Sequence, residues 1–392
     1  MQRKNAARLL TIGSAALIVA CGGGSSGAPA PAPAPPPAPA PAPPQAPTLD
    51  LNSPTQFDIA ATNHSVPFGN GTGVHIAGDG RVLFTYTINS RVHIGRASTS
   101  SAPSVTELNF FSFASALGVN GNDAVLVLTR PSLRRMEALL SSDFGSTWSG
   151  AAGSDPDVLG DAGTGASVPA ACVWRDANGL QALAAWVAPP SSDAGGPMYV
   201  AHWRQGSGWS AVERVGSGST YTAPTLACSD SAQQLVARED LGSGRNQIVR
   251  FDRTGAGAWS GGGTIIANGA DPHYCVAGSD AWVGYHHLGS ALIGHSVAGA
   301  AFVSTELDTT GKFVPAACHA GGHAVVCNGD WDSKADADAR APGRRILCHA
   351  SHDAGATWTT FSPAPGQSDQ NVTSAHLSAV SYTHLTLPTS EL

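Results

Sequence analysis

The chain has 392 residues, of which only 12% are charged, while glycine occurs 46 times and proline 27 times. This composition favours a protein rich in turns and strands over a helical one. The formal net charge is −7, so nothing in the composition indicates a nucleic-acid partner, which would require a basic surface.

The first 20 residues have the features of an export signal. Three basic residues precede an apolar run at 9–20, which is too short for a comfortable membrane span. The run ends in "IVAC" at Cys21, which resembles the lipobox of bacterial lipoproteins. The resemblance implies a signal peptide at 1–20, diacylation of Cys21 and, because Gly22 follows, an outer-membrane lipoprotein of the cell envelope. An ordinary cleaved signal peptide is the alternative.

Residues 21–48 form the predicted linker, first rich in glycine and serine and then in alternating alanine and proline. Alanine–proline repeats favour the extended polyproline II conformation, at roughly 3.1 Å per residue. We therefore expect a spacer between lipid and folded domain, with a docking site for a proline-binding partner as the alternative.

Residues 49–379 contain a repeat, and the repeat predicts the fold. Four segments share a proline, a cysteine and a following turn, with their cysteines 43 to 56 residues apart (Cys172, Cys228, Cys275 and Cys318). Two weaker copies precede them, with Ile76 and Leu117 in place of the cysteine. Each copy contains about four short strand-like runs, a pattern typical of propeller blades. We predict an all-β, six-bladed β-propeller with four-stranded antiparallel blades.

The end of the chain leaves the number of blades open. Residues 371–379 resemble the start of a further copy, which would begin a seventh blade. Residues 380–392 are similar to adapter-derived tails on proteins from metagenomic assemblies. We expect this tail to be non-native and leave it out of the fold prediction.

An eight-residue motif occurs twice, as "SSDFGSTW" at 141–148 and "SHDAGATW" at 351–358. Both copies fall between the third and fourth strands of a blade and resemble the Asp-box of sialidase-type propellers. Its positions here are Ser141, Asp143, Gly145, Thr147 and Trp148, then Ser351, Asp353, Gly355, Thr357 and Trp358. We expect each aspartate to accept hydrogen bonds from its own turn, each glycine to adopt a positive φ and each tryptophan to pack between sheets. The resemblance implies a structural motif on the face opposite the ligand.

The predicted binding face comprises the loops between second and third strands and those that enter each blade. Its aromatic, charged and amide-bearing residues suit a sugar, whose apolar faces stack on rings and whose hydroxyls form hydrogen bonds. The candidates are Arg130, Arg134, Trp186, Arg238, Glu239, Tyr274, Tyr285, His286, Asp330 and Trp331.

Catalytic sialidases use three arginines, a Tyr–Glu pair and an aspartate, according to the family resemblance. The first copy here lacks the family's Arg-Ile-Pro motif, and no catalytic residue is assignable. We therefore expect a monomeric, non-catalytic module that recognises a glycan or an envelope protein and contacts the membrane only through its lipid. A divergent glycoside hydrolase of exo-sialidase type or a polysaccharide lyase is the first alternative, and an envelope scaffold is the second.

No cofactor and no metal are expected. A disulfide between Cys327 and Cys348 is favoured over a metal site in the sixth copy, since a turn at 321–322 would place His319 and His323 on opposite faces. The acidic segment 330–340 lacks the glycine and distant glutamate of a calcium loop. The four repeat cysteines are expected to pack as small buried apolar residues near the axis.

Overall fold

The structure is a computed structural model that describes residues 73–361, apart from short gaps of which the longest are 150–155 and 331–344. The signal peptide, Cys21, the linker, the possible seventh copy and the C-terminal tail lie outside the described residues. No helix in the described part is long and apolar enough to cross a membrane.

The first three sheets form blades A to C. Blade A comprises β1 (Gly73–Ile76), β2 (Arg81–Ile88), β3 (Arg91–Ser98) and β4 (Ser101–Phe111). Blade B comprises β5 (Ser115–Asn120), β6 (Asp123–Arg130), β7 (Arg135–Ser141) and β8 (Asp157–Asp161), with the 3-10 helix η1 (Pro131–Leu133) after β6. Blade C comprises β9 (Ala170–Asp176), β10 (Gly179–Val187), β11 (Met198–Arg204), β12 (Gly208–Trp209) and β13 (Glu213–Val215).

The other three sheets form blades D to F. Blade D comprises β14 (Tyr221–Cys228), β15 (Ala232–Gly242), β16 (Arg245–Thr254) and β17 (Ser260–Ala267). Blade E comprises β18 (Ala270–Ala277), β19 (Asp280–His287), β20 (Ser290–Val297) and β21 (Val303–Asp308). Blade F comprises β22 (Gly311–Lys312), β23 (Ala316–His319), β24 (His323–Asp330), β25 (Arg345–Ser351) and β26 (Thr359–Phe361).

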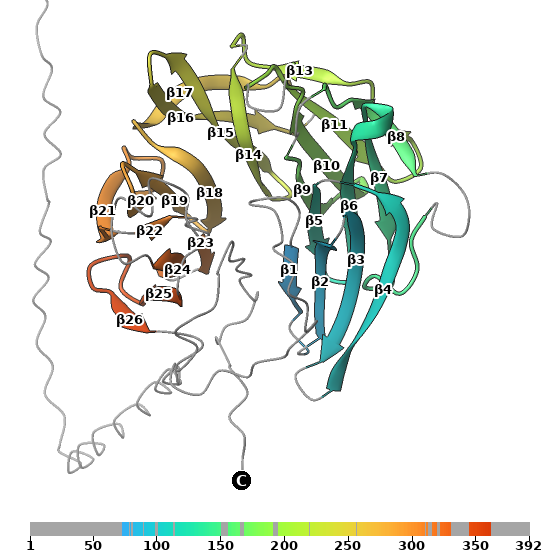
Figure 1. The fold of residues 1–392 in the computed structure, drawn as a ribbon, viewed down its shortest axis with the longest axis horizontal. Coiled ribbons are helices and arrows are strands. Elements are labelled where there is room, and N and C mark those ends of the chain that lie inside the picture. The colour runs from blue at the N-terminus through green and yellow to red at the C-terminus, as the bar shows by residue number, and fades with distance from the viewer. Residues whose placement is uncertain are drawn as a thin grey trace, which may run out of the picture. The chain divides into compact units, whose positions relative to one another are not determined.

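These six antiparallel sheets form a β-propeller, which confirms the predicted fold. The first strands of successive blades lie side by side near the axis, in the order β1, β5, β9, β14, β18 and β23 (Figure 1). Blades A, B, D and E have four strands each. In blade C, β12 and β13 both pair with β11 and share the outermost position. In blade F, β22 and β23 both pair with β24 and share the innermost position.

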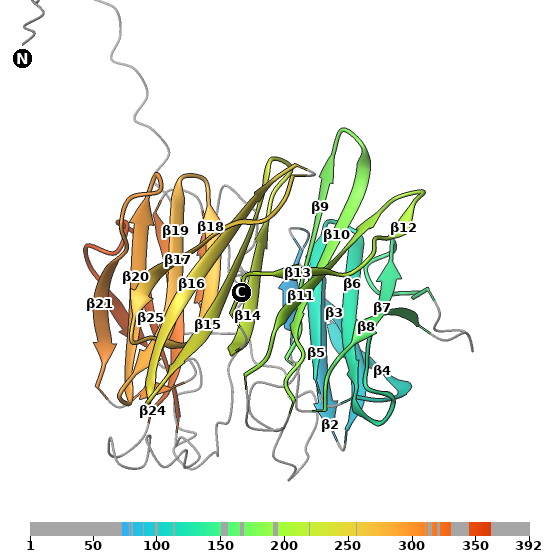
Figure 2. The ribbon, with the colours of Figure 1, turned by 90° about the horizontal axis from the view of Figure 1, so that it is seen from above.

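The core consists of apolar clusters between successive blades. Second strands are buried on both sides: β6 has the sequence DAVLVLTR, and its first seven residues are buried. Outermost strands such as β21 face solvent over most of their length. Figure 2 shows the sheets standing next to one another, edge-on. A propeller buries its second strands from two sides, and this explains why these runs are continuously apolar rather than alternating.

The repeated prolines shape the innermost strands. β14 is irregular between Thr222 and Thr225, around Pro224, and β18 is irregular between Ala270 and His273, around Pro272. Proline has no N–H to donate to the neighbouring strand, so the ladder is interrupted where it occurs.

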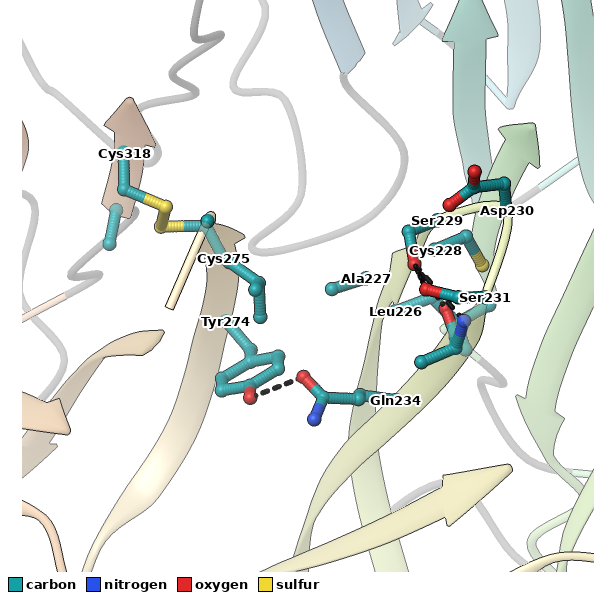
Figure 3. Close-up of a pocket in the computed structure, with 14 residues that line it drawn as sticks. Leu226, Ala227, Cys228, Ser229, Asp230, Ser231, Gln234, Tyr274, Cys275 and Cys318 are labelled. Carbon is teal, nitrogen blue, oxygen red and sulfur yellow. Dashed lines mark hydrogen bonds between the residues drawn. A yellow bond between two sulfur atoms is a disulfide. The ribbon is translucent and has the colours of Figure 1, made fainter. Parts of the chain in front are cut away.

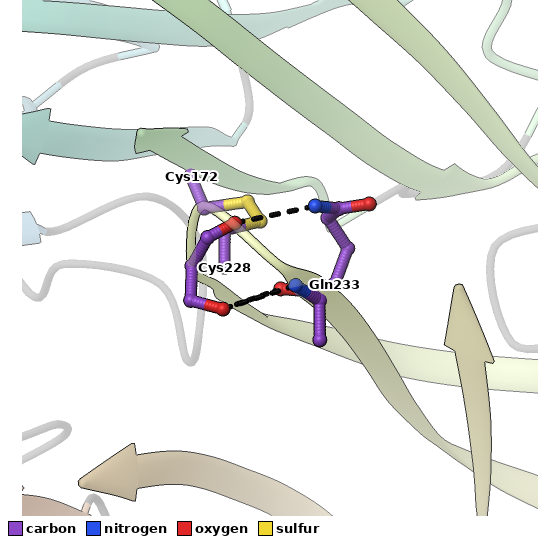
Figure 4. The surroundings of a disulfide bond; sticks show 5 residues. Cys172, Cys228 and Gln233 are labelled. Carbon is purple, nitrogen blue, oxygen red and sulfur yellow. Dashed lines mark hydrogen bonds between the residues drawn. A yellow bond between two sulfur atoms is a disulfide. The ribbon is translucent and has the colours of Figure 1, made fainter. Parts of the chain in front are cut away.

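The prediction for the four repeat cysteines is wrong. Cys172 on β9 forms a disulfide with Cys228 on β14, and Cys275 on β18 forms one with Cys318 on β23. Equivalent positions of consecutive blades face each other near the axis, with a Cα–Cα distance of 6.0 Å in both pairs, which is within disulfide reach. Figure 4 shows the first of these bonds beside Gln233.

Blade F contains a third disulfide and a second correction. Cys327 and Cys348 face each other on β24 and β25, with Cα atoms 4.0 Å apart, and their sulfurs are bonded. The register of β23 and β24 pairs His319 directly with His323. The sequence argument that put these two positions on opposite faces of the hairpin is therefore wrong.

Candidate functional site

Each Asp-box is a closed hydrogen-bonded turn. Asp143 Oδ1 accepts hydrogen bonds from the Thr147 N–H at 2.8 Å and the Ser141 hydroxyl at 2.9 Å, and Oδ2 accepts one from the Thr147 hydroxyl at 2.7 Å. Gly145 has a φ of 72° and donates its N–H to Ser141 Oγ at 2.8 Å. Asp353 makes the same three contacts with Ser351 and Thr357.

Both boxes fasten their blade to the preceding blade. The box of blade B packs Gly145 and Phe144 against Leu83 of β2, and the box of blade F packs Gly355 and Trp358 against Trp282 of β19. Leu83 and Trp282 are both the third residue of a second strand and are fully buried. The box is therefore a contact between blades as well as a turn.

The boxes also identify the two ends of the propeller. Phe144 N–H donates to Asn122 O at 2.8 Å, and Ala354 N–H donates to Gly322 O at 3.0 Å, so each box touches the turn between the first and second strands of its own blade. Because strand direction alternates, loops between second and third strands lie at the other end. We call these ends the Asp-box face and the opposite face.

Asp143→Asn tests the structural role of the box. The Thr147 backbone N–H above all lowers the pKa of Asp143 from its ordinary 3.8 to about 2, although partial burial opposes this. Since the pKa falls on folding, the carboxylate stabilises the fold above pH 3.8, and this stabilisation is lost as the pH falls through about 2. We expect the variant to lose ~1 kcal/mol at neutral pH, a modest figure because the group is partly solvated.

The measurement is urea unfolding of both proteins between pH 7 and pH 2. The difference between wild type and Asp143→Asn should shrink as the pH falls below about 4, as the carboxylate becomes protonated. Asp157→Asn on β8 replaces an exposed aspartate and is the matched control. It should unfold with the same free energy as wild type at every pH. Wild-type stability of Asp143→Asn at pH 7 would contradict the assigned role.

Two aromatic candidates of the predicted binding face belong to the core instead. Trp186 on β10 is 1% exposed and donates Nε1–H to Asp161 O at 3.0 Å. Tyr285 on β19 is 4% exposed and bonds its hydroxyl to Ser304 Oγ at 2.8 Å. Both pack between blades, so neither presents a ring to a sugar. The structure therefore places these two candidates in the core rather than on the predicted binding face.

The charged candidates of blade B are paired with acidic neighbours. Arg130, at the end of β6, lies 3.3 Å from the buried carboxylate of Glu137 on β7. Arg134 follows η1 and lies 3.5 Å from Asp161, with both side chains largely exposed. Arg130 pairs with Arg135 on the β6–β7 ladder, and Arg135 pairs with Asp161 on the β7–β8 ladder, so both ion pairs lie at the same end of blade B.

The candidates of blades D and E also contact polar neighbours within their own blades. Glu239 accepts a hydrogen bond from Gln247 Nε2 at 2.7 Å, and its neighbour Arg238 on β15 is partly buried. His286 Nδ1 lies 3.6 Å from an Asp271 carboxylate oxygen. Asp330 ends β24, and Trp331 lies outside the described residues. These contacts of Glu239 and His286 each lie within a single blade.

Tyr221 and Glu239 form a Tyr–Glu pair that was not predicted from the sequence. The register of β14 and β15 sets Tyr221 opposite Glu239, and the glutamate contacts the phenol. Tyr221 is 3% exposed, its hydroxyl accepts the Gly218 N–H at 3.1 Å, and burial raises its pKa. A buried, protonated phenol that accepts a hydrogen bond from a turn is a poor nucleophile. We therefore interpret the pair as structural.

A cavity of about 740 Å³ lies near the axis, at the Asp-box face rather than at the predicted one. Blades D, E and F line it. Its mouth includes the exposed turn Ser229, Asp230 and Ser231, and its wall includes the Cys275–Cys318 disulfide. Figure 3 shows the turn on one side and the disulfide on the other, with Tyr274 and Gln234 between them.

Among the described residues, Tyr274 is the one candidate of the predicted binding face that lines this cavity. Its hydroxyl donates to Gln234 Oε1 at 2.7 Å, and Gln234 Nε2 donates to Asp252 Oδ1 at 2.9 Å. Burial raises the pKa of Tyr274 to about 12, so the phenol stays neutral in physiological buffers. The chain of hydrogen bonds fixes one polar wall, while Leu226, Ala227 and Val276 add apolar surface.

Within the described residues, no group of three or more histidine, cysteine, aspartate or glutamate side chains is arranged to hold a metal ion. The cavity lining there includes one charged residue, Asp230. The arrangement suits a neutral molecule that combines hydroxyls with apolar faces.

No protein-family model and no curated protein matches this chain. Solved structures with a similar fold include the Hadza microbial sialidase Hz136, at 11% identity and a TM-score of 0.41, over 78% of this chain and 60% of that one. The six-bladed fucose-binding lectin of Aleuria aurantia matches at 11% identity and 0.48, over 76% and 99%. TolB from Acinetobacter baumannii matches at 15% identity and 0.40, over 61% and 55%. Such distant similarity concerns the fold alone.

Proposed function

We propose that this protein is a non-catalytic recognition module that binds the neutral part of a glycan in the axial cavity. The cavity carries the proposal, because about 740 Å³ is within the usual range for small-ligand sites and its wall combines fixed polar groups with apolar surface. A sugar ring presents the same combination, with hydroxyls at its edge and C–H groups on its faces.

The described lining argues against hydrolysis. Glycoside hydrolases generally place two carboxyl groups about 5–9.5 Å apart across the scissile bond. Asp230 supplies one carboxylate, and the lining includes no second acid, histidine or arginine among the described residues. The same lining disfavours sialic acid, because an arginine clamp is absent from it and Asp230 would repel the sugar carboxylate.

We further propose that the protein is exported and lipid-anchored. Three disulfides suit an oxidising compartment. In this proposal the signal-like segment directs export and Cys21 carries the lipid. The partner would be a glycan or an envelope protein at the membrane surface. Palmitate labelling that persists in Cys21→Ser would refute the anchor.

The ligand is tested with the exported protein on an array of neutral and sialylated glycans, followed by calorimetry on any binder. Ser231→Trp narrows the mouth of the cavity and should weaken binding more than ~10-fold, or ~1.4 kcal/mol. Ser207→Trp, on the exposed turn after β11, is the matched control and should bind like wild type. Unchanged binding by Ser231→Trp, or turnover of a glycoside that survives purification, would contradict the proposal.

A further inference from the structure

A histidine pair stands on the Asp-box face of blade F, outside the axial cavity. His323 begins β24, and His352 directly follows β25. The register pairs Ala324 with Ser351, so the two histidines occupy the next facing positions along the same ladder. Their Nδ1 atoms are 3.1 Å apart, and their ring centroids are 5.2 Å apart at 64°.

We propose that His323 and His352 bind a divalent transition-metal ion, with Zn²⁺ as the type case, through their Nδ1 atoms. Two nitrogens at ~2.0–2.1 Å from one ion are ~2.8–3.4 Å apart for ligand angles between 90° and the tetrahedral value. The observed 3.1 Å falls within that interval. Neutral imidazole is a preferred ligand of Zn²⁺, Cu²⁺ and Ni²⁺, whereas Mg²⁺ and Ca²⁺ prefer oxygen.

The facing nitrogens explain why an ion fits here. Without an ion, one ring donates its Nδ1–H to the Nδ1 lone pair of the other. A metal ion binds the Nδ1 lone pairs of both rings once the donor ring has moved its proton from Nδ1 to Nε2, so both rings bind in the neutral form and no proton is lost. His352 is exposed and His323 partly so, which leaves the remaining coordination positions open to water. The site would bind an ion reversibly, as an open two-ligand site does.

The backbone beneath both rings is held in place before any ion arrives. Ala354 N–H donates to Gly322 O at 3.0 Å, which ties the turn before His323 to the Asp-box that contains His352. Asp353 is fixed by Ser351 and Thr357. Little ordering is therefore needed on binding, which favours affinity. The excess of acidic over basic residues, 28 to 21, further favours cations near the protein.

The test is calorimetric titration of the untagged full chain with ZnCl2, and with MgCl2 as the oxygen-preferring control. We expect one equivalent of Zn²⁺ to bind and Mg²⁺ to give no signal. His323→Ala and His352→Ala should each weaken Zn²⁺ binding more than ~10-fold, since even groups behind the ligands contribute 10–100-fold. His287→Ala, at the end of β19 on the opposite face, should bind like wild type.

A second readout separates binding from folding. Zn²⁺ should raise the melting temperature of wild type and His287→Ala, and not that of the two site variants. Circular dichroism in EDTA checks that each variant is folded, and His352→Gln replaces His352→Ala if the latter is not. Absence of Zn²⁺ binding by wild type, or binding that survives in folded His323→Ala and His352 variants, would overturn the assignment.

Discussion

Replacing Cys172 and Cys228 together by alanine is expected to lower the free energy of unfolding by about 2–4 kcal/mol. The bond joins β9 of blade C to β14 of blade D across 56 residues, so its loss frees a long segment of the unfolded chain. Chain-entropy reasoning gives ~4 kcal/mol for a loop of that length, an upper figure because unfolded chains retain structure. Urea unfolding monitored by tryptophan fluorescence measures the change.

The other two cysteine pairs provide the matched comparison. Cys275 and Cys318 close a loop of 43 residues, and their joint replacement should cost nearly as much. Cys327 and Cys348 close 21 residues within one blade, so their replacement should cost less, at most ~3 kcal/mol. Mass spectrometry of the exported, non-reduced protein checks the pairing. Free thiols at these positions, or equal stability of all variants and wild type, would contradict the assignment.

Trp186→Ala is expected to cost about 3–5 kcal/mol, the range for removing a large aromatic side chain from a packed core. The indole is fully buried between blades B and C and loses its hydrogen bond to Asp161 O as well. Thermal unfolding followed by near-UV circular dichroism provides the measurement.

Trp203→Ala on β11 is the control for that change, because Trp203 is only partly buried against the same cluster. It should cost distinctly less than Trp186→Ala. If Trp186→Ala melted like wild type but had lost glycan binding, the tryptophan would be a ligand residue after all.

The sequence predicted the blades because a blade is a local unit. Its proline, cysteine and turn recur along the chain, and an Asp-box closes through hydrogen bonds to residues at most four positions away. Local patterns of this kind survive in the order of residues. The six described blades, the box geometry and the positive φ of Gly145 and Gly355 all followed from them.

The cavity is formed jointly by blades D, E and F, and the sequence did not predict it. Trp186 and Tyr285 come near the end of a second strand and look like loop residues, but neighbouring blades cover that strand on both sides. The cavity is lined by residues of β14, β18 and β23, which belong to three different blades, so no pattern within one copy of the repeat encodes it. The disulfides were predictable in principle, since cysteines one blade apart occupy equivalent positions next to each other.

The inter-blade disulfides have a mechanical consequence for the ring. They fuse C to D and E to F, which leaves the seam between D and E without a covalent link among the described residues. The Tyr274–Gln234 hydrogen bond crosses that seam beside the cavity. Rotation of the linked pair C–D relative to the linked pair E–F would therefore occur at the seam between D and E, where it would widen or narrow the cavity. A ligand that contacts both blades D and E would restrict this rotation and make the propeller more rigid.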